Sequence, residues 1–474
     1  DYISEPSLAF GFDQNAEYPR DGLLLFGPVQ DHRVLRDVRF GVIGTAEGIQ
    51  RLERWAASVH GPIERFRPPY NPQAQHHVSF PGFEAVFRAR WAGRPAARIE
   101  IAEKPLRQAL SIGNRHEAVK KAVDLFVEPL VLHANREEIQ PECWFVVIPE
   151  FVHTQGRPQY KVPKGERSGG DISISVSRAR RLQKEPSLFD FEEEEAGIYR
   201  YAINFRRQLK ARLLAHKIVT QIVRETTLTP GDFLNEKGYP LRKVEDPATI
   251  AWKLCTTAYY KTVGNPWRLA NVRPGVCYVG LVYKSTDPMG GSANACCAAQ
   301  MFLASGDGIV FRGAAGPWYT PSTKEYHLSR EAAAELMSLV VSEYRRGHNG
   351  VAPSELFIHG RARFADEEWE GFSSVVPAET NLVGVQIRDA RSELKLFREG
   401  RYPVMRGTVL KLSPHSAFLW TSGFVPRLGT YIGPETPNPV LVTKQKGDCD
   451  LATVLRDVMG LTKINFNTCQ FNDR

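Results

Sequence analysis

The sequence predicts an α/β protein built from two domains. Short apolar strands alternate with amphipathic helices along most of the chain, which is typical of parallel sheets covered by helices. The 474 residues leave room for two large domains or three smaller ones. Glycine and proline cluster at residues 264–274, directly before a long apolar strand. We therefore expect one domain over residues 1–270, including an N-terminal lead-in, and a second over residues 271–474.

The first domain opens with a strand-to-helix unit. An apolar strand at residues 38–43 precedes a helix that carries Ile49, Leu52 and Trp55 on one stripe, the spacing of a buried helical face. The pattern then predicts, in order, a proline-rich loop at 61–83, a helix at 114–131, a strand at 144–148, an acidic loop tip at 192–195, a helix from 205, a short strand over 218–219 with Gln221 at its end, and a helix at 246–261.

The second domain is predicted to mix strands, helices and hairpins around another sheet. Its expected elements are strands at 276–283, 298–304 and 308–312, a helix at 329–346, a strand at 356–359, hairpins over 382–421 and a helix at 451–459.

Composition excludes several classes of protein. Hydrophobic residues make up 42% of the chain and charged residues 24%, so a disordered chain, a collagen-like fibre and a disulfide-dense miniprotein are excluded. No apolar run reaches about 18 residues, so no transmembrane helix is predicted. The 7 cysteines form no C-x-x-C pair, which argues against a zinc ribbon and favours a reducing, cytoplasmic location.

The charge balance favours a polyanionic partner. Lys and Arg number 61 against 53 Asp and Glu, giving a formal net charge of +8. Such an excess attracts nucleic acid through counterion release. Charge alone fits a merely basic enzyme equally well.

Residues 205–227 and the helix that follows them hold the candidate site. Arg206 and Lys210 are four apart and share one helical face. Gln221 lies 11 residues later and offers an amide donor without charge. Lys253 and Lys261 are eight apart, about 80° around a helix at ~100° per residue. We expect these side chains to converge on a terminal monophosphate.

Two aromatic residues of the same helix complete this candidate site. Tyr259 or Tyr260 is placed to stack on a nucleic-acid base. On spacing alone, the cations also fit a helix face whose charges only promote solubility.

Several motifs in the same order resemble Argonaute proteins. Residues 205–227 resemble the signature that binds a guide 5′-phosphate in the Argonaute MID domain, and residues 260–267 resemble the end of that domain. Residues 279–282, 357–361 and 461–467 are similar to three elements of the PIWI domain. The match is good over roughly residues 200–474.

The resemblance is strongest to short prokaryotic Argonautes, which consist of MID and PIWI domains only. Residues 20–23 and 80–83 look like this subgroup in particular. The implied fold is a Rossmann-like MID domain followed by an RNase H-like PIWI domain, here trimmed at the C-terminus.

The sequence departs from nuclease members of this family. Those enzymes use a set of carboxylates to hold two metal ions about 4 Å apart. Val282 and Arg361 occupy the first and third of the four corresponding positions, the fourth would fall beyond Arg474, and Asp287 and Asp307 are off register. A valine cannot bind a metal ion and an arginine repels one. We therefore predict no nuclease activity, and Arg361 is free either to bind a backbone phosphate or to form a salt bridge.

The resemblance also implies partners. Short Argonautes load a 5′-phosphorylated guide RNA, recognise complementary single-stranded DNA and pair with a protein that carries an APAZ domain fused to an effector. We expect a sirtuin-like effector in preference to a TIR domain, with NAD depletion in defence against plasmids and phages. Mg²⁺ at the guide 5′-phosphate is the expected cofactor; no catalytic metal and no membrane partner are expected.

Three other interpretations stay open. One is a guide-dependent nuclease whose carboxylates we have not recognised. Another is a metabolic enzyme that binds a nucleotide cofactor, although neither G-x-G-x-x-G after a strand nor G-x-x-x-x-G-K-[ST] occurs. The last is an interaction scaffold.

Overall fold

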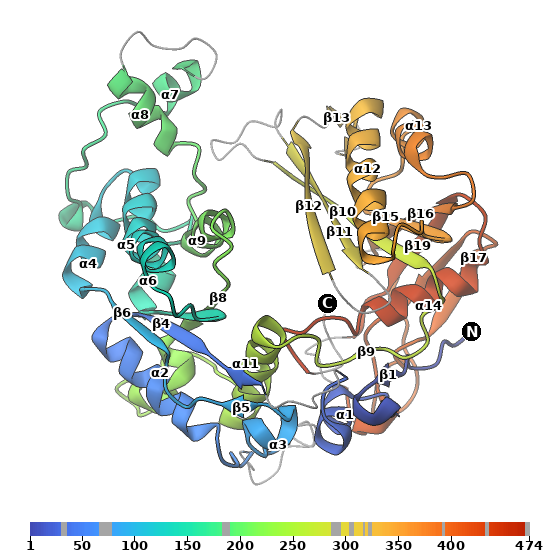
Figure 1. Cartoon of the computed structure of the whole chain (residues 1–474), viewed down its shortest axis with the longest axis horizontal. Helices are drawn as coiled ribbons and strands as arrows, with labels where there is room; N and C mark the ends of the chain where they lie inside the picture. Colours follow the sequence, from blue (N-terminus) through green and yellow to red (C-terminus); the bar gives the residue numbers. More distant parts are fainter. Residues whose placement is uncertain are drawn as a thin grey trace.

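The computed structural model contains two lobes that lie side by side, with α11 (Pro247–Thr262) and β9 (Arg268–Leu269) between them (Figure 1). It describes residues 1–29, 36–65, 78–182, 190–285, 295–302, 308–315, 318–320, 325–390, 394–431 and 436–469. The junction predicted at residues 264–274 falls between α11 and the first strand of the second lobe.

The first lobe is built on a four-stranded parallel sheet in the order β6-β4-β7-β8. Its strands are β4 (Phe40–Gly44), β6 (Ala97–Glu100), β7 (Cys143–Ile148) and β8 (Thr220–Arg224). All six residues of β7 are buried, as expected for an inner strand covered by helices on both faces. Gln221 is the second residue of the edge strand β8 and lies three residues before its end. Our prediction that Gln221 ends a strand is therefore wrong.

Helices cover both faces of this sheet. One face packs against α2 (Ala46–Ser58), α3 (Phe83–Phe87) and α11, and the other against α4 (Glu103–Ser111), α5 (Arg115–Arg136), α6 (Glu150–Gln155) and α9 (Phe205–Leu214). The predicted stripe of Ile49, Leu52 and Trp55 is buried in the first of these interfaces. Smaller elements are α1 (Pro19–Phe26), β3 (Asp37–Val38), β5 (Arg90–Trp91) and α10 (Glu225–Leu228).

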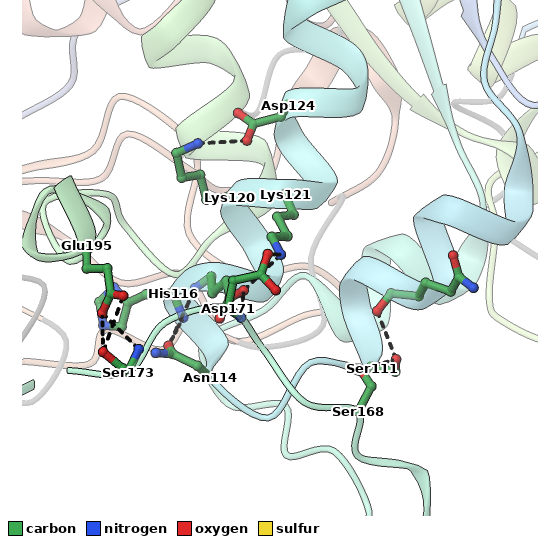
Figure 2. Close-up of polar contacts among 12 residues, drawn as sticks. Ser111, Asn114, His116, Lys120, Lys121, Asp124, Ser168, Asp171, Ser173 and Glu195 are labelled. Carbon is green, nitrogen blue, oxygen red and sulfur yellow. Dashed lines mark hydrogen bonds and ion pairs between the residues drawn. The ribbon is translucent and has the colours of Figure 1, made fainter. Parts of the chain in front are cut away.

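An insertion between β7 and α9 carries two further helices, α7 (Val176–Leu182) and α8 (Asp190–Ile198). Figure 2 shows how this segment is held: Glu195 accepts bonds from the backbone N–H of Ser173, and Asp171 pairs with Lys121 of α5 at 2.6 Å. The acidic run that we predicted to be a loop tip lies instead within α8, where Glu192 pairs with Arg178 and Glu195 accepts from Ser173.

The second lobe contains an eight-stranded mixed sheet in the order β12-β11-β10-β15-β16-β19-β18-β17. The central strands β10, β15 and β16 are parallel to one another. The strands are β10 (Val276–Ser285), β11 (Ala295–Phe302), β12 (Gly308–Ala315), β15 (Glu355–Gly360), β16 (Asn381–Asp389), β17 (Val409–Ser413), β18 (Ser416–Leu419) and β19 (Val440–Lys446), with a separate pair β13 (Trp318–Thr320) and β14 (Glu325–His327).

Helices also cover this sheet on both sides. Leu336 and Val340 of α12 (Arg330–Gly347) and Phe372 of α13 (Asp366–Val375) pack on one face, and α14 (Leu451–Leu461) packs on the other. Among the helices that the structure describes, none is both long and apolar enough to cross a membrane.

The first five residues of the chain contact the second lobe, whereas Leu8, Phe10 and Leu23 join a core cluster of the first. Residues 1–3 pair with residues 407–409, and β1 (Leu8–Ala9) pairs with β2 (Asn15–Ala16) and β9. Glu5 contacts Arg406 at 3.0 Å and Lys463 at 2.8 Å, and both cationic side chains are 1% exposed. This buried ion triad explains the placement.

We predict that Glu5→Gln lowers the free energy of unfolding by about 3–5 kcal/mol, because it leaves two buried cations without their carboxylate. Urea denaturation measures the loss. Glu47→Gln is the matched control, since the Glu47 carboxylate is 75% exposed in its pair with Arg51 and should contribute less than about 1 kcal/mol. Equal stability of the two variants would contradict the prediction.

Candidate nucleic-acid interface

The edge strand β8 lies between two helices that pack on opposite faces of the sheet. Ile222 of β8 joins the apolar cluster that contains Phe205 and Leu209 of α9. Val223 points to the other face and joins the cluster that contains Ala251 of α11. Alternation along the strand therefore directs Gln221 toward α11, while α9 runs along the opposite side.

Lys261 and Gln221 are in direct contact. Lys261 Nζ donates to Gln221 Oε1 at 2.5 Å and to the backbone oxygen of Thr220 at 2.8 Å. Burial lowers the pKa of Lys261 to about 8; the nearby Cys143 thiol opposes this shift and the Lys210 ammonium adds to it. Because its Oε1 accepts from a lysine, Gln221 keeps its amide nitrogen as a donor.

Arg206 and Lys210 come from α9, one helical turn apart, and both side chains are exposed. Desolvation lowers the pKa of Lys210, and the neighbouring Arg206 guanidinium lowers it further. Lys210 also interacts electrostatically with Lys261. The helix begins where Asn204 accepts a bond from the backbone N–H of Arg207, which fixes the turn that presents Arg206.

These four side chains are called the β8 site below: Arg206, Lys210, Gln221 and Lys261. In the part of the chain that the structure describes, no carboxylate forms an ion pair with any of its three cations. Guanidinium, ammonium and amide donors without a neutralising acid are groups suited to bind an anion such as a phosphate monoester.

Lys253, which we also predicted to bind phosphate, has a different partner. Its Nζ pairs with Glu245 at 2.6 Å. The two helical turns between Lys253 and Lys261 separate their side chains along the axis by about 12 Å. The structure therefore brings Lys261, and not Lys253, to Gln221.

The two tyrosines predicted to stack on a base differ in exposure. Tyr259 is fully buried and its ring stacks on Phe87, with centroids 5.2 Å apart. This burial raises its pKa. The prediction of base stacking is wrong for Tyr259, because both ring faces lie in the core. Tyr260 is partly buried and packs on Phe466 at 4.6 Å.

The C-terminal residues lie against the end of α11, next to the β8 site. Thr257 donates to the backbone oxygen of Phe466 at 3.3 Å, and Trp267 Nε1 donates to that of Lys463 at 3.0 Å. Residues 260–267 and 461–467 are therefore neighbours in space although about 200 residues separate them in sequence.

Sequence reasoning missed further cations at the carboxyl ends of β7 and β8. Arg224 ends β8 and pairs with Glu150, which follows β7; Arg224 Nε and Glu150 Oε2 are 3.0 Å apart. Arg242 lies beside them, and its Nε donates to the Thr226 hydroxyl at 2.7 Å. Parallel strands end at one edge of a sheet, and that rule could have indicated the Arg224 and Glu150 pair.

In the second lobe, Val282 and Arg361 lie at the same end of neighbouring parallel strands. Gly280 of β10 pairs with His359 of β15, so the same register continued by two residues places Val282 opposite Arg361. Val282 is 59% exposed and Arg361 is exposed. Asp287 and Asp307 lie outside the described residues. Within the described residues, no group of three or more His, Cys, Asp or Glu side chains could hold a metal ion.

Buried amides fix the turn that carries Arg361. Gln386 Nε2 donates to the backbone oxygen of Arg361 at 2.9 Å, and Gln445 Nε2 donates to Gln386 Oε1 at 2.8 Å. Gln445 Oε1 in turn accepts from the backbone N–H of Phe364 at 3.0 Å. The Arg361 side chain thus projects from a rigid turn.

Comparison with known proteins identifies the fold. No protein-family model and no curated protein sequence matches the chain. Solved structures do match, among them Clostridium butyricum Argonaute bound to a guide DNA and a 19-mer target DNA, with a TM-score of 0.58 at 13% identity over 99% of this chain and 50% of that one. The fold is that of the MID and PIWI regions of Argonaute proteins.

Two other Argonautes give the same result. A. aeolicus Argonaute matches with a TM-score of 0.54 at 15% identity, over 99% of this chain and 50% of that one. Marinitoga piezophila Argonaute, in complex with a 5′-OH guide RNA, matches with a TM-score of 0.52 at 9% identity, over 99% and 55%. The chain therefore spans about half the length of the Argonautes it resembles, and the Rossmann-like and RNase H-like folds expected from the sequence are confirmed.

We predict that binding of a 5′-phosphorylated oligonucleotide weakens as pH rises through about 8. Lys261 has a lowered pKa of about 8 and is charged below that pH, while a phosphate monoester is already a dianion above pH 7. The protonated fraction falls by up to about tenfold for each pH unit above the pKa. Titrations between pH 7 and 9.5 measure the effect.

Lys261→Arg is the control for this pH dependence, because arginine stays charged throughout the range. Its binding curve should be flat. A wild-type affinity that does not change between pH 7 and 9.5 would contradict the assignment.

Proposed function

We propose that this chain binds the 5′-phosphate of a guide RNA at the β8 site and presents the guide for pairing with complementary single-stranded DNA. The observation that carries the proposal is the β8 site itself: three cations and an amide without a neutralising carboxylate, in a fold shared with Argonautes. Base pairing supplies sequence specificity in such a system, so the protein needs only a terminal anchor and a charged path for the backbone.

The choice of RNA as the guide is part of the proposal. Among the matching Argonautes, one structure holds a guide DNA and another a guide RNA. A binding assay with both guide types of identical sequence separates the two.

We further propose that the chain does not cleave its target. Val282 and Arg361 stand at adjacent strand ends where metal-binding carboxylates are expected, and an exposed guanidinium at Arg361 suits a backbone phosphate better than a metal ion. The alternative, a nuclease with an unrecognised carboxylate set, stays a testable possibility.

Mg²⁺ at the guide phosphate does not enter the proposal. Magnesium favours carboxylate and phosphate oxygens, whereas the donors of the β8 site are ammonium, guanidinium and amide groups. The described residues do not fit a metal site there, so no step of the proposal depends on the ion.

The effector activity is proposed to lie in a partner. The support for this part of the proposal is the resemblance of the sequence to short prokaryotic Argonautes. We infer that an APAZ-domain protein, fused to a sirtuin-like effector in preference to a TIR domain, consumes NAD after target recognition in defence against plasmids and phages.

We predict that Lys210→Ala combined with Gln221→Ala weakens binding of 5′-phosphorylated guide RNA at least about 100-fold, because each lost bond to a charged group contributes about 1.5–3 kcal/mol. Affinity for the 5′-hydroxyl form should change little. Lys253→Ala removes a cation that pairs with Glu245 and is the matched control. Wild-type protein that does not distinguish the 5′-phosphate from the 5′-hydroxyl would refute the proposal.

We predict that guide-loaded protein with Mg²⁺ or Mn²⁺ leaves a complementary labelled DNA intact, because Val282 and Arg361 cannot bind the metal ions. NAD should fall only when target DNA and the copurified partner are both present. A gel assay follows the DNA, and an enzymatic assay follows NAD. Metal-dependent cleavage at a fixed position would establish the nuclease alternative.

A further inference from the structure

Two adjoining cavities of about 210 and 140 Å³ lie at the carboxyl ends of β7 and β8. They share the side chains of Ile148, His153 and Arg206 as a common wall. Arg206 also belongs to the β8 site, so these cavities begin where that site ends. We call them the arginine cavities, after the guanidinium groups that line them: Arg157, Arg206, Arg224 and Arg242.

The arginine cavities carry more positive charge than their surroundings neutralise. Glu150 pairs with Arg224. For the other three guanidinium groups, the described part of the chain provides no carboxylate at ion-pair distance. Arg157 contacts the neutral ring of His153, and Arg242 donates to the hydroxyls of Thr226 and Thr227.

The pKa of His153 reflects this excess charge. Its pKa is lowered to about 4, first by burial and then by Arg224 and Arg157, with Arg206 adding to the effect. The ring is therefore neutral at physiological pH, and it contributes a hydrogen-bonding group without adding repulsion.

Guanidinium groups held around one enclosed space repel one another, and a bound anion offsets that repulsion. The N-terminus of α9 adds to the positive potential, because Asn204 and Phe205 line the smaller cavity and a helix N-terminus carries about half a positive charge. Three unpaired guanidinium groups match an anion that carries several charges, and a single phosphate leaves most of them unused.

The arginine cavities and the β8 site lie along one strand. Gln221 and Arg224 are three residues apart on β8, a distance of about 10 Å at 3.3 Å per residue. Arg206 connects the two places, since it lines both cavities and interacts electrostatically with Lys210. Because Arg206 belongs to the β8 site and lines both cavities, an anion bound at the β8 site that extends past Arg206 enters the arginine cavities.

We propose that the arginine cavities bind the β- and γ-phosphates of RNA with a 5′-triphosphate, while its α-phosphate occupies the β8 site. This inference rests on the proposed function and extends it to the chemical class of guide. The protein would then accept unprocessed primary transcripts as well as monophosphorylated RNA.

The test compares one RNA sequence with a 5′-hydroxyl, a 5′-monophosphate or a 5′-triphosphate. Wild-type protein should bind the triphosphate at least as tightly as the monophosphate. Arg242→Gln and, separately, Arg157→Gln should weaken triphosphate binding about tenfold or more and change monophosphate binding less than threefold. Lys253→Ala is the control, since it removes one cation from the same lobe outside the cavities.

Several results would overturn the inference. Triphosphate binding weaker than monophosphate binding in the wild type excludes it. If the two variants lose the same affinity for both RNAs, the arginines contribute either to the monophosphate site or to the stability of the fold. Thermal unfolding of the variants distinguishes these two outcomes. A change in preference for the first base would assign the cavities to that base instead.

Failure of the proposed function gives a different pattern. If the hydroxyl and monophosphate forms bind alike, the β8 site does not anchor a phosphate. Tighter triphosphate binding that depends on Arg242 would still support the arginine cavities as a separate polyphosphate site.

Discussion

Unneutralised positive charge along the edge strand β8 is the constraint on which the proposed chemistry depends. An edge strand leaves one side without a neighbouring strand, and here α9 and α11 bring cations to that side. Desolvation lowers the pKa values of Lys210 and Lys261, so keeping these two side chains charged costs free energy. A phosphate dianion would offset that cost. The excess positive charge that destabilises the free site therefore stabilises the site with an anion bound.

In the second lobe, the parallel strands β10 and β15 bring Val282 and Arg361 to the same end of the sheet. The amides of Gln386 and Gln445 hold the adjoining turn in place. An exposed guanidinium on a turn held in this way is suited to contact a phosphate group, as proposed above.

Sequence patterns located the elements well where the signal was local. Helical spacing paired Arg206 with Lys210, and alternation of strands and helices gave both sheets. Side-chain partners were not predictable from spacing: Lys253 pairs with Glu245, which lies just before its helix, and the ring of Tyr259 is covered by Phe87 of α3. The cluster around Arg224 and Arg242 was missed for the same reason, because its members come from three separate segments of the chain. Nothing local indicated that Glu5 joins the second lobe, since the buried partners Arg406 and Lys463 lie about 400 residues away.

Lys463, close to the end of the chain, is bonded to the N-terminal segment and to the linker between the lobes. Its ammonium donates to the backbone oxygens of Pro6 and Glu17, while its own carbonyl accepts from Trp267 in the linker. The same residue therefore holds the start of the chain against the linker that follows α11. Loss of this one ammonium group would release the N-terminal segment from the residues that contact Trp267, so both segments depend on a single side chain for their position.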